Sequence, residues 1–166
     1  MPMDSHPVAA ALGGSDRGDL VDIRSPCAVA AAHQLVIVAG GGRQLAWPVA
    51  RIAVHLLQIS AGRSVRALLH GAARGADQSI AAAADQLGWP VIACPALWQQ
   101  HGRAAGPIRN RQMLHRAIAL LAAAPAGAAL QVVAFPGGAG TASLIHHTRA
   151  LMARSSLPIA LRAIHA

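Results

Sequence analysis

The sequence predicts an α/β protein with a Rossmann-like, doubly wound and mainly parallel five-stranded sheet that carries helices on both faces. Hydrophobic residues make up 54% of the chain but aromatic residues only 2%, so Ala, Leu, Ile and Val must fill the core, as in helices packed on a central sheet. Short β-type runs also alternate with longer Ala-rich runs, which is the pattern of repeated βαβ units. At 166 residues, a single domain is expected.

The predicted domain covers residues 34–166. Residues 1–33 mix Pro, Gly, Asp, Ser and Ala without the period of a helix or strand, and we predict a flexible N-terminal leader there. Gly88 and Pro90 mark one helix end, and Pro107 suits the first turn of the next helix. Strands are predicted at 35–39, 65–69, 90–94, 130–135 and 157–161, and helices near 46–60, 76–87, 107–122 and 140–154. This alternation implies right-handed crossovers between parallel strands.

The chain is strongly basic and contains no lysine. Its 14 arginines and 6 acidic residues give a net charge of +8, which makes a polyanion one candidate partner. The arginines are scattered, however, and form no run of like charges, so nucleic acid is the less favoured partner. Composition alone therefore leaves a small anionic ligand and a nucleic acid open.

The sequence shows no pattern typical of a metal site, a membrane span or a secretory signal. Cys27 and Cys94 have no metal-ligand spacing and are predicted to be free thiols, and the histidines show no HExxH pattern, so no metal site is predicted. No uninterrupted apolar run of membrane-spanning length occurs, and the N-terminus does not resemble a secretory signal. We therefore expect a soluble, cytoplasmic protein.

The first predicted strand is followed by GGGR, Gly40 to Arg43. Three glycines permit a sharp turn that presents backbone amides to an anion, with Arg43 as a charged partner. A turn that needs positive φ explains the same glycines. Leu45 stands where the GxGxxG fingerprint has its last glycine, so no standard NAD site is predicted.

The second predicted strand leads into HGAARGAD, His70 to Asp77. Arg74 can pair with a phosphate, and Asp77 can accept hydrogen bonds from ribose hydroxyls or a base edge. Alternatively, Asp77 only favours the N-terminus of the following helix. His70 has no acid or nucleophile beside it in the sequence and is interpreted as a hydrogen-bonded wall residue.

A long loop, Pro95 to Met113, follows the third predicted strand. Trp98 can stack on a base or simply fix the loop. Arg109 and Asn110 fall in the first turn after Pro107, where free amides and a planar guanidinium favour an anion.

AFPGGAGT, Ala134 to Thr141, is the most specific of the loops. An apolar strand stops at proline, and a glycine-rich turn enters an Ala-rich helix, which is the geometry of a phosphate-binding loop. The glycines allow close approach of a ligand, and Thr141 can donate a hydroxyl hydrogen bond. No GK[ST] follows, so a Walker-type nucleoside triphosphatase is not predicted.

Taken together, GGR, HGAARGAD, the AxW-to-GPIRNxxM stretch and AFPGGAGT resemble the SLOG superfamily, in particular its DUF2493 branch, the YspA/cpYpsA-related family. The resemblance covers about residues 34–162. It implies a Rossmann-like domain that binds nucleotide-derived ligands, as a sensor or as a processing domain.

Two relatives of this superfamily have contrasting functions. The "Lonely guy" phosphoribohydrolases carry PGGxGTxxE, whose glutamate belongs to the catalytic pair; the corresponding residue is Leu144 here, whereas Arg109 resembles the arginine of that pair. Asp77 would then have to supply the carboxylate that an oxocarbenium-like state requires. The DNA-processing protein of natural transformation resembles the chain in the ARGAD turn and the RNR segment, although few aromatics are present for base stacking.

The sequence therefore predicts a protein that binds a nucleotide-derived, phosphate-bearing small molecule, with no other cofactor and with a homo-oligomer as a further expectation. A phosphoribohydrolase acting on a nucleoside monophosphate and a single-stranded DNA-binding protein stay open as alternatives, and Arg109 and Asp77 are the catalytic candidates. The predicted ligand-binding residues are Gly40, Gly41, Gly42, Arg43, His70, Gly71, Arg74, Gly75, Asp77, Trp98, Arg109, Asn110, Met113, Pro136, Gly137, Gly138, Gly140 and Thr141.

Overall fold

The computed structural model of the chain describes residues 34–165, which form a Rossmann-like α/β fold. Five strands lie in one sheet in the order β3-β2-β1-β4-β5, and every neighbouring pair is parallel. The predicted fold class is confirmed, and the described sheet is parallel throughout. The predicted leader lies outside the described residues. The strands are β1 (Leu35–Gly40), β2 (Val65–His70), β3 (Val91–Ala93), β4 (Ala129–Ala134) and β5 (Ile159–Ala163).

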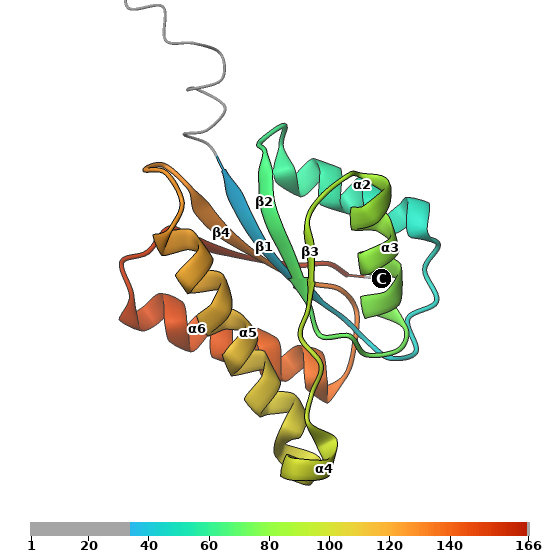
Figure 1. The fold of residues 1–166 in the computed structure, drawn as a ribbon. Helices are drawn as coiled ribbons and strands as arrows, with labels where there is room; N and C mark the ends of the chain where they lie inside the picture. The colour runs from blue at the N-terminus through green and yellow to red at the C-terminus, as the bar shows by residue number, and fades with distance from the viewer. Residues whose placement is uncertain (1–33, 166) are drawn as a thin grey trace, which may run out of the picture.

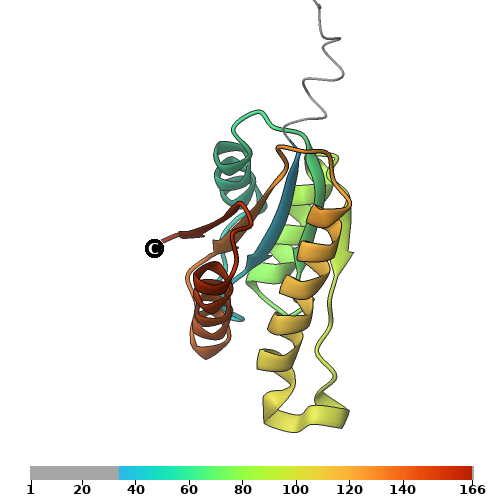
Figure 2. The same ribbon diagram turned by 90° about the vertical axis from the view of Figure 1, so that its left-hand side faces the viewer.

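Helices cover both faces of the sheet. Figure 1 shows α2 (Val49–Ser60) and α3 (Ala76–Gln86) on one side, and α5 (Ala105–Ala122) and α6 (Ala139–Arg154) on the other. Figure 2 views the molecule from the side of α5 and α6. The short helix α4 (Trp98–His101) and a 3-10 turn precede α5, at the end of the molecule toward which the strands run. No helix within residues 34–165 is long and apolar enough to cross a membrane.

The central strand β1 is buried along its whole length, as a parallel strand covered on both faces should be. Successive side chains alternate between two apolar clusters. Leu35 and Ile37 pack with α2 and α3, whereas Val36 and Val38 pack with α5 and α6. The alternation fixes the register of β1 between its neighbours, because a slip of one residue would exchange the two faces.

Proline accounts for several element boundaries that differ from the prediction. Helix α2 begins at Val49 instead of residue 46 because Pro48 disfavours helical backbone at the residue before it. Strand β5 begins after Pro158, which has no N–H to give to a ladder, although its carbonyl accepts from Leu130. Helix α5 begins at Ala105, two residues before the predicted start, and Pro107 still falls in its first turn.

The strand order places a topological switch point between β1 and β4. From β1 the chain proceeds to β2 and β3 on one side, and from β4 it proceeds to β5 on the other. The loops that leave β1 and β4 therefore diverge, and open α/β sheets bind ligands in the crevice between such loops.

Candidate functional site

A cavity of about 750 Å³ opens at this switch point. Its wall comes from the loops that follow β1, β2 and β4, and from α4, the 3-10 turn and the first turns of α5 and α6. Segments far apart in the sequence therefore meet at one place, because the carboxyl ends of parallel strands share one edge of the sheet.

The loops after β1 and β4 are joined by backbone hydrogen bonds. The Phe135 amide donates to the Gly40 carbonyl at 2.8 Å, and the Gly42 amide donates to the Pro136 carbonyl at 2.9 Å. Gly137 is required by this close approach, because a Cβ there would overlap with the Thr141 hydroxyl and lie 2.5 Å from the Gly42 nitrogen. Gly40, Gly41 and Gly42 do not have positive φ, so close packing explains their presence and a left-handed turn does not.

The N-terminus of α6 points its free amides toward the same cavity. Thr141, in its first turn, is only 7% exposed, and its Oγ1 is buried without a hydrogen-bond partner. A Cβ added at Gly138 or Gly140 would meet no atom within 4 Å, so both residues border open space. A helix N-terminus favours binding of an oxyanion when it has a hydroxyl without a partner and glycines without side chains to block the approach.

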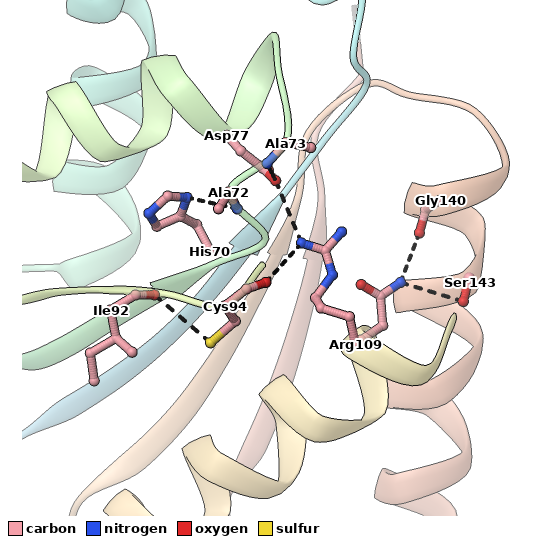
Figure 3. Close-up of polar contacts among 10 residues, drawn as sticks. His70, Ala72, Ala73, Asp77, Ile92, Cys94, Arg109, Gly140 and Ser143 are labelled. Atoms are coloured by element: carbon pink, nitrogen blue, oxygen red, sulfur yellow. Dashed lines mark hydrogen bonds and ion pairs between the residues drawn. The ribbon is translucent and has the colours of Figure 1, made fainter. Parts of the chain in front are cut away.

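Asp77 and Arg109 form an ion pair in the wall of the cavity (Figure 3). Arg109 Nη1 lies 3.8 Å from Asp77 Oδ2, and the two side chains are 13% and 4% exposed. Asp77 Oδ2 also accepts a hydrogen bond from the Ala73 amide at 3.1 Å, whereas Asp77 Oδ1 has no partner. Arg109 Nη1 donates to the Cys94 carbonyl at 3.4 Å, and Arg109 Nε has no partner. Each member of the pair thus has one buried polar atom without a hydrogen-bond partner.

Burial sets the direction of the pKa shifts around this pair. It raises the pKa of Asp77 above its usual 3.8, against the opposing effects of the Ala73 amide, the Arg109 guanidinium, His70 and the Gly41 amide. Burial lowers the pKa of Arg109, while the neighbouring Asp77 carboxylate acts to raise it. An isolated water-excluded pair of this kind is costly unless the unused atoms find partners. A polar ligand in the cavity would provide them.

Gly71 is needed to admit the Arg109 side chain. A Cβ at position 71 would overlap with the Arg109 guanidinium. Gly75 has φ of 77°, and a side chain there would overlap with the Arg43 carbonyl, so this glycine shapes the loop behind the cavity.

Asn110 and His70 make hydrogen bonds that support the loops of the site. Asn110 is 3% exposed, and its Nδ2 donates to the Gly140 carbonyl at 3.1 Å and to Ser143 Oγ at 3.4 Å, which ties α5 to the start of α6. His70 Nδ1 accepts from the Ala72 amide at 3.2 Å, and burial lowers the pKa of His70. His70 is thus hydrogen-bonded, as interpreted from the sequence, but it does not line the cavity. The contacts of Asn110 give it a positioning role that the sequence did not indicate.

The mouth of the cavity is formed by an arginine and an indole ring. The Arg43 guanidinium carbon lies 4.9 Å from the centroid of the Trp98 ring, a cation–π contact between the β1 loop and α4. Trp98 is 47% exposed. By contrast, Trp47 and Trp89 pack against the core on the α2 side.

The structure brings most of the predicted residues together. All of the predicted ligand-binding residues line the cavity except His70, Arg74 and Gly75. Arg74 lines a neighbouring cavity, while His70 and Gly75 lie behind the wall.

Two lining residues of chemical interest were missed. Arg103 belongs to the 3-10 turn after α4, and no sequence period predicted these short elements. Leu144, three residues into α6 from Thr141, also lines the cavity and is 2% exposed. Its place was recognised in the sequence only as the position of an absent glutamate.

Comparison with known proteins supports the resemblance over part of the chain. Residues 35–101 match the family described as "YspA, cpYpsA-related SLOG family", which covers β1 through α4 and implies a nucleotide-related binding domain without naming a ligand. No curated protein and no solved structure matches the chain.

Proposed function

From the SLOG-family sequence of residues 35–101, we propose that the chain binds a nucleotide-derived, phosphate-bearing ligand in the cavity between the β1 and β4 loops, as a sensor or processing domain. The phosphate binds at the N-terminus of α6, against Thr141 and the amides of the preceding glycines. Arg109 and Arg43 neutralise its charge. Asp77 accepts a hydrogen bond from a sugar hydroxyl or from a base edge.

The observation that carries this proposal is the unsatisfied hydroxyl of Thr141. Thr141 Oγ1 is buried without a partner, although leaving a buried polar group unpaired costs about 1–3 kcal/mol. The hydroxyl lies in the first turn of a 16-residue helix whose free amides face the same cavity. A bound phosphate would satisfy both kinds of donor.

The experiment is a ligand screen followed by a matched pair of variants. Thermal unfolding of the purified protein is measured with nucleoside mono-, di- and triphosphates, NAD, ADP-ribose and cyclic nucleotides, because a ligand that binds the native state raises the midpoint. Thr141→Val removes the free hydroxyl and should weaken binding of the best ligand at least about tenfold, while leaving the stability of the free protein unchanged or higher.

Thr148→Val is the control on the same helix. Thr148 is fully buried, but its hydroxyl already donates to the Leu144 carbonyl at 2.8 Å and lies outside the cavity wall. Thr148→Val should keep full affinity. Equal binding by Thr141→Val and the unaltered protein would refute the proposed phosphate site.

Cleavage of an N-glycosidic bond is the second candidate function, and the Asp77–Arg109 pair favours it. An ideal Cβ at Gly40 would lie 3.8 Å from Asp77 Oδ1 and 3.3 Å from Leu144 Cδ2. Asp77 and Leu144 therefore both lie beside Gly40 in the wall of the first cavity, and the position of Leu144 holds glutamate in the phosphoribohydrolases that the sequence resembles. In this reaction the bond between the anomeric carbon and the base breaks and a bond from that carbon to a water oxygen forms. The departing base gains the proton that the water loses, and Asp77 stabilises the positive charge on the sugar.

Base release separates binding from turnover. Each stabilising nucleotide is incubated with the protein and the mixture is analysed by chromatography. Base release is then compared between the unaltered protein and Asp77→Asn at nucleotide concentrations that saturate each of them. A loss of release that exceeds the loss of nucleotide affinity in this variant would support the hydrolase. Binding without release would establish the sensor.

The distribution of charge along the chain is the reason to test single-stranded DNA as a ligand. Residues 86–165 contain seven arginines and no acidic residue. Oligonucleotide binding that falls steeply with salt, and that a saturating nucleotide does not displace, would support this alternative.

A further inference from the structure

A second cavity of about 430 Å³ adjoins the first at the ends of β2 and β3. Its wall comes from the β2 loop, Gly71 to Arg74, and from Pro95, Ala96 and Trp98 after β3. Arg43, Gly71, Ala73, Trp98 and Arg109 line both cavities. The two spaces are therefore neighbours that share one wall.

Three arginines line this second cavity, Arg43, Arg74 and Arg109, and none of its lining residues is acidic. Asp77 lines the first cavity only. Within residues 34–165, Arg109 is the member of this trio that pairs with a carboxylate. Arg43 and Arg74 thus bring two positive charges to the site without an internal counter-ion, and guanidinium groups bind phosphate oxygens in two-pronged geometry.

Arg109 lies between the two spaces. Its Nη1 is held by Asp77 Oδ2 and the Cys94 carbonyl, its Nε is buried without a partner, and its guanidinium lies against the bare Gly71. Repulsion from the Arg43 guanidinium also contributes to the lowered pKa of Arg109, so these two groups are close enough to interact. Anionic groups on both sides of Arg109 would relieve this repulsion.

The groups that can bind an anion are distributed over the two cavities. Thr141 lines the first cavity and not the second, whereas Arg74 lines the second and not the first. Trp98 lines both, and its contact with Arg43 holds that guanidinium at the shared mouth. The polar groups are therefore divided between two anion positions.

We propose that the ligand carries a second anionic group, which binds among Arg43, Arg74 and Arg109 in the second cavity while the first phosphate binds at Thr141. The ligand class is thus a nucleotide with two phosphate groups, and a nucleoside monophosphate occupies only part of the site. This inference rests on the proposed function and narrows its ligand.

The test compares adenosine 5′-monophosphate with adenosine 5′-diphosphate by isothermal titration calorimetry at one ionic strength. Because the second phosphate gains charge-assisted hydrogen bonds from the arginines, the diphosphate should bind at least about tenfold more tightly. Arg74→Ala should remove this preference and leave monophosphate affinity within about twofold. Thr141→Val should weaken both ligands alike. Arg154→Ala, an exposed arginine at the end of α6, is the control for non-specific attraction.

Two further ligands locate the second phosphate. A dinucleotide diphosphate tests a bridging diphosphate, and adenosine 3′,5′-bisphosphate tests two separate phosphates. A preference of either over the monophosphate that Arg74→Ala abolishes supports the second anion position and identifies its source.

The outcomes distinguish this inference from the function on which it rests. If the monophosphate binds and no second phosphate adds affinity, or if Arg74→Ala weakens every ligand to the same extent, the second anion position is refuted and the proposed function stands. If no nucleotide binds the unaltered protein, both are refuted.

Discussion

The Arg109 guanidinium occupies the space that a side chain at position 71 would fill, and Gly71 has none. This contact between the loop after β2 and the first turns of α5 lets the arginine reach Asp77 at 3.8 Å and the Cys94 carbonyl at 3.4 Å. The charge at the centre of the candidate site therefore depends on the absence of one methyl group.

Gly71→Ala should consequently damage the site more than the fold. The added Cβ must displace the guanidinium from Asp77, but this group ends a flexible side chain, so the loss of stability should be about 1 kcal/mol, at the low end for overpacking. Urea unfolding should show this loss, and calorimetry should show weaker nucleotide binding. Unchanged stability together with unchanged affinity would mean that Arg109 adopts another conformation without cost and that its contact with Gly71 is not needed for binding.

Gly140→Ala should act on the ligand alone. A Cβ at Gly140 meets nothing within 4 Å, and alanine is favoured over glycine in a helix by about 0.5–1 kcal/mol. We expect unchanged or slightly higher stability by urea unfolding and weaker nucleotide binding, since the methyl group enters the first cavity. Full affinity in this variant would place the phosphate elsewhere.

Asp77 and Arg109 should be energetically coupled. Removing one partner leaves a largely buried charge without compensation. The losses in the free energy of unfolding caused by Asp77→Asn and by Arg109→Gln should therefore add up to more than the loss in the double variant. A double-mutant cycle in urea should give a coupling energy of about 0.5–3 kcal/mol. Strict additivity would show that solvent in the cavity screens the pair.

His70 should make stability depend on pH. Burial lowers the pKa of His70 in the folded protein below its usual 6.5, and its Nδ1 must stay unprotonated to accept from the Ala72 amide. The unfolded chain therefore binds a proton first as the pH falls. The contribution of His70 to stability is complete above 6.5 and is lost as the pH falls from there toward the folded pKa.

His70→Asn is the variant that checks this dependence, because asparagine keeps an acceptor oxygen but does not titrate. The free energy of unfolding is measured at about pH 7.5 and about pH 5.5. The decrease at the lower pH should be smaller in the variant than in the unaltered protein. The His70 imidazolium also acts to lower the pKa of Asp77, so the comparison reports the titration of His70 together with its effect on Asp77.

Trp98 should report ligand binding by fluorescence. It lines both cavities and is 47% exposed, whereas the described Trp47 and Trp89 pack against the core. Nucleotide titration should change the emission of the protein, and Trp98→Phe should remove most of that change. A response that survives in Trp98→Phe would indicate a conformational effect on the core tryptophans.

The sequence predicted the elements of the fold because their signals are local. Apolar runs such as LVIVA and the alternation with Ala-rich helices depend on residues close in the chain, and the structure confirms all five strands and the four long helices within residues 34–165. Helix α4 was missed because four residues are too few to show a helical period. The glycine-rich loops were located correctly because glycine is a strong local signal.

The sequence also singled out Asp77 and Arg109 as residue types suited to a nucleotide. It could not show that they form a pair, that Gly71 makes room for the guanidinium, or that Asn110 binds α6 instead of facing solvent. Nor could it show that Arg74 borders a separate cavity. These relationships join residues that are distant in the chain, and they arise only when parallel strands bring their carboxyl ends to one edge of the sheet. Tertiary packing therefore decided which of the predicted side chains meet and which polar atoms stay free for a ligand.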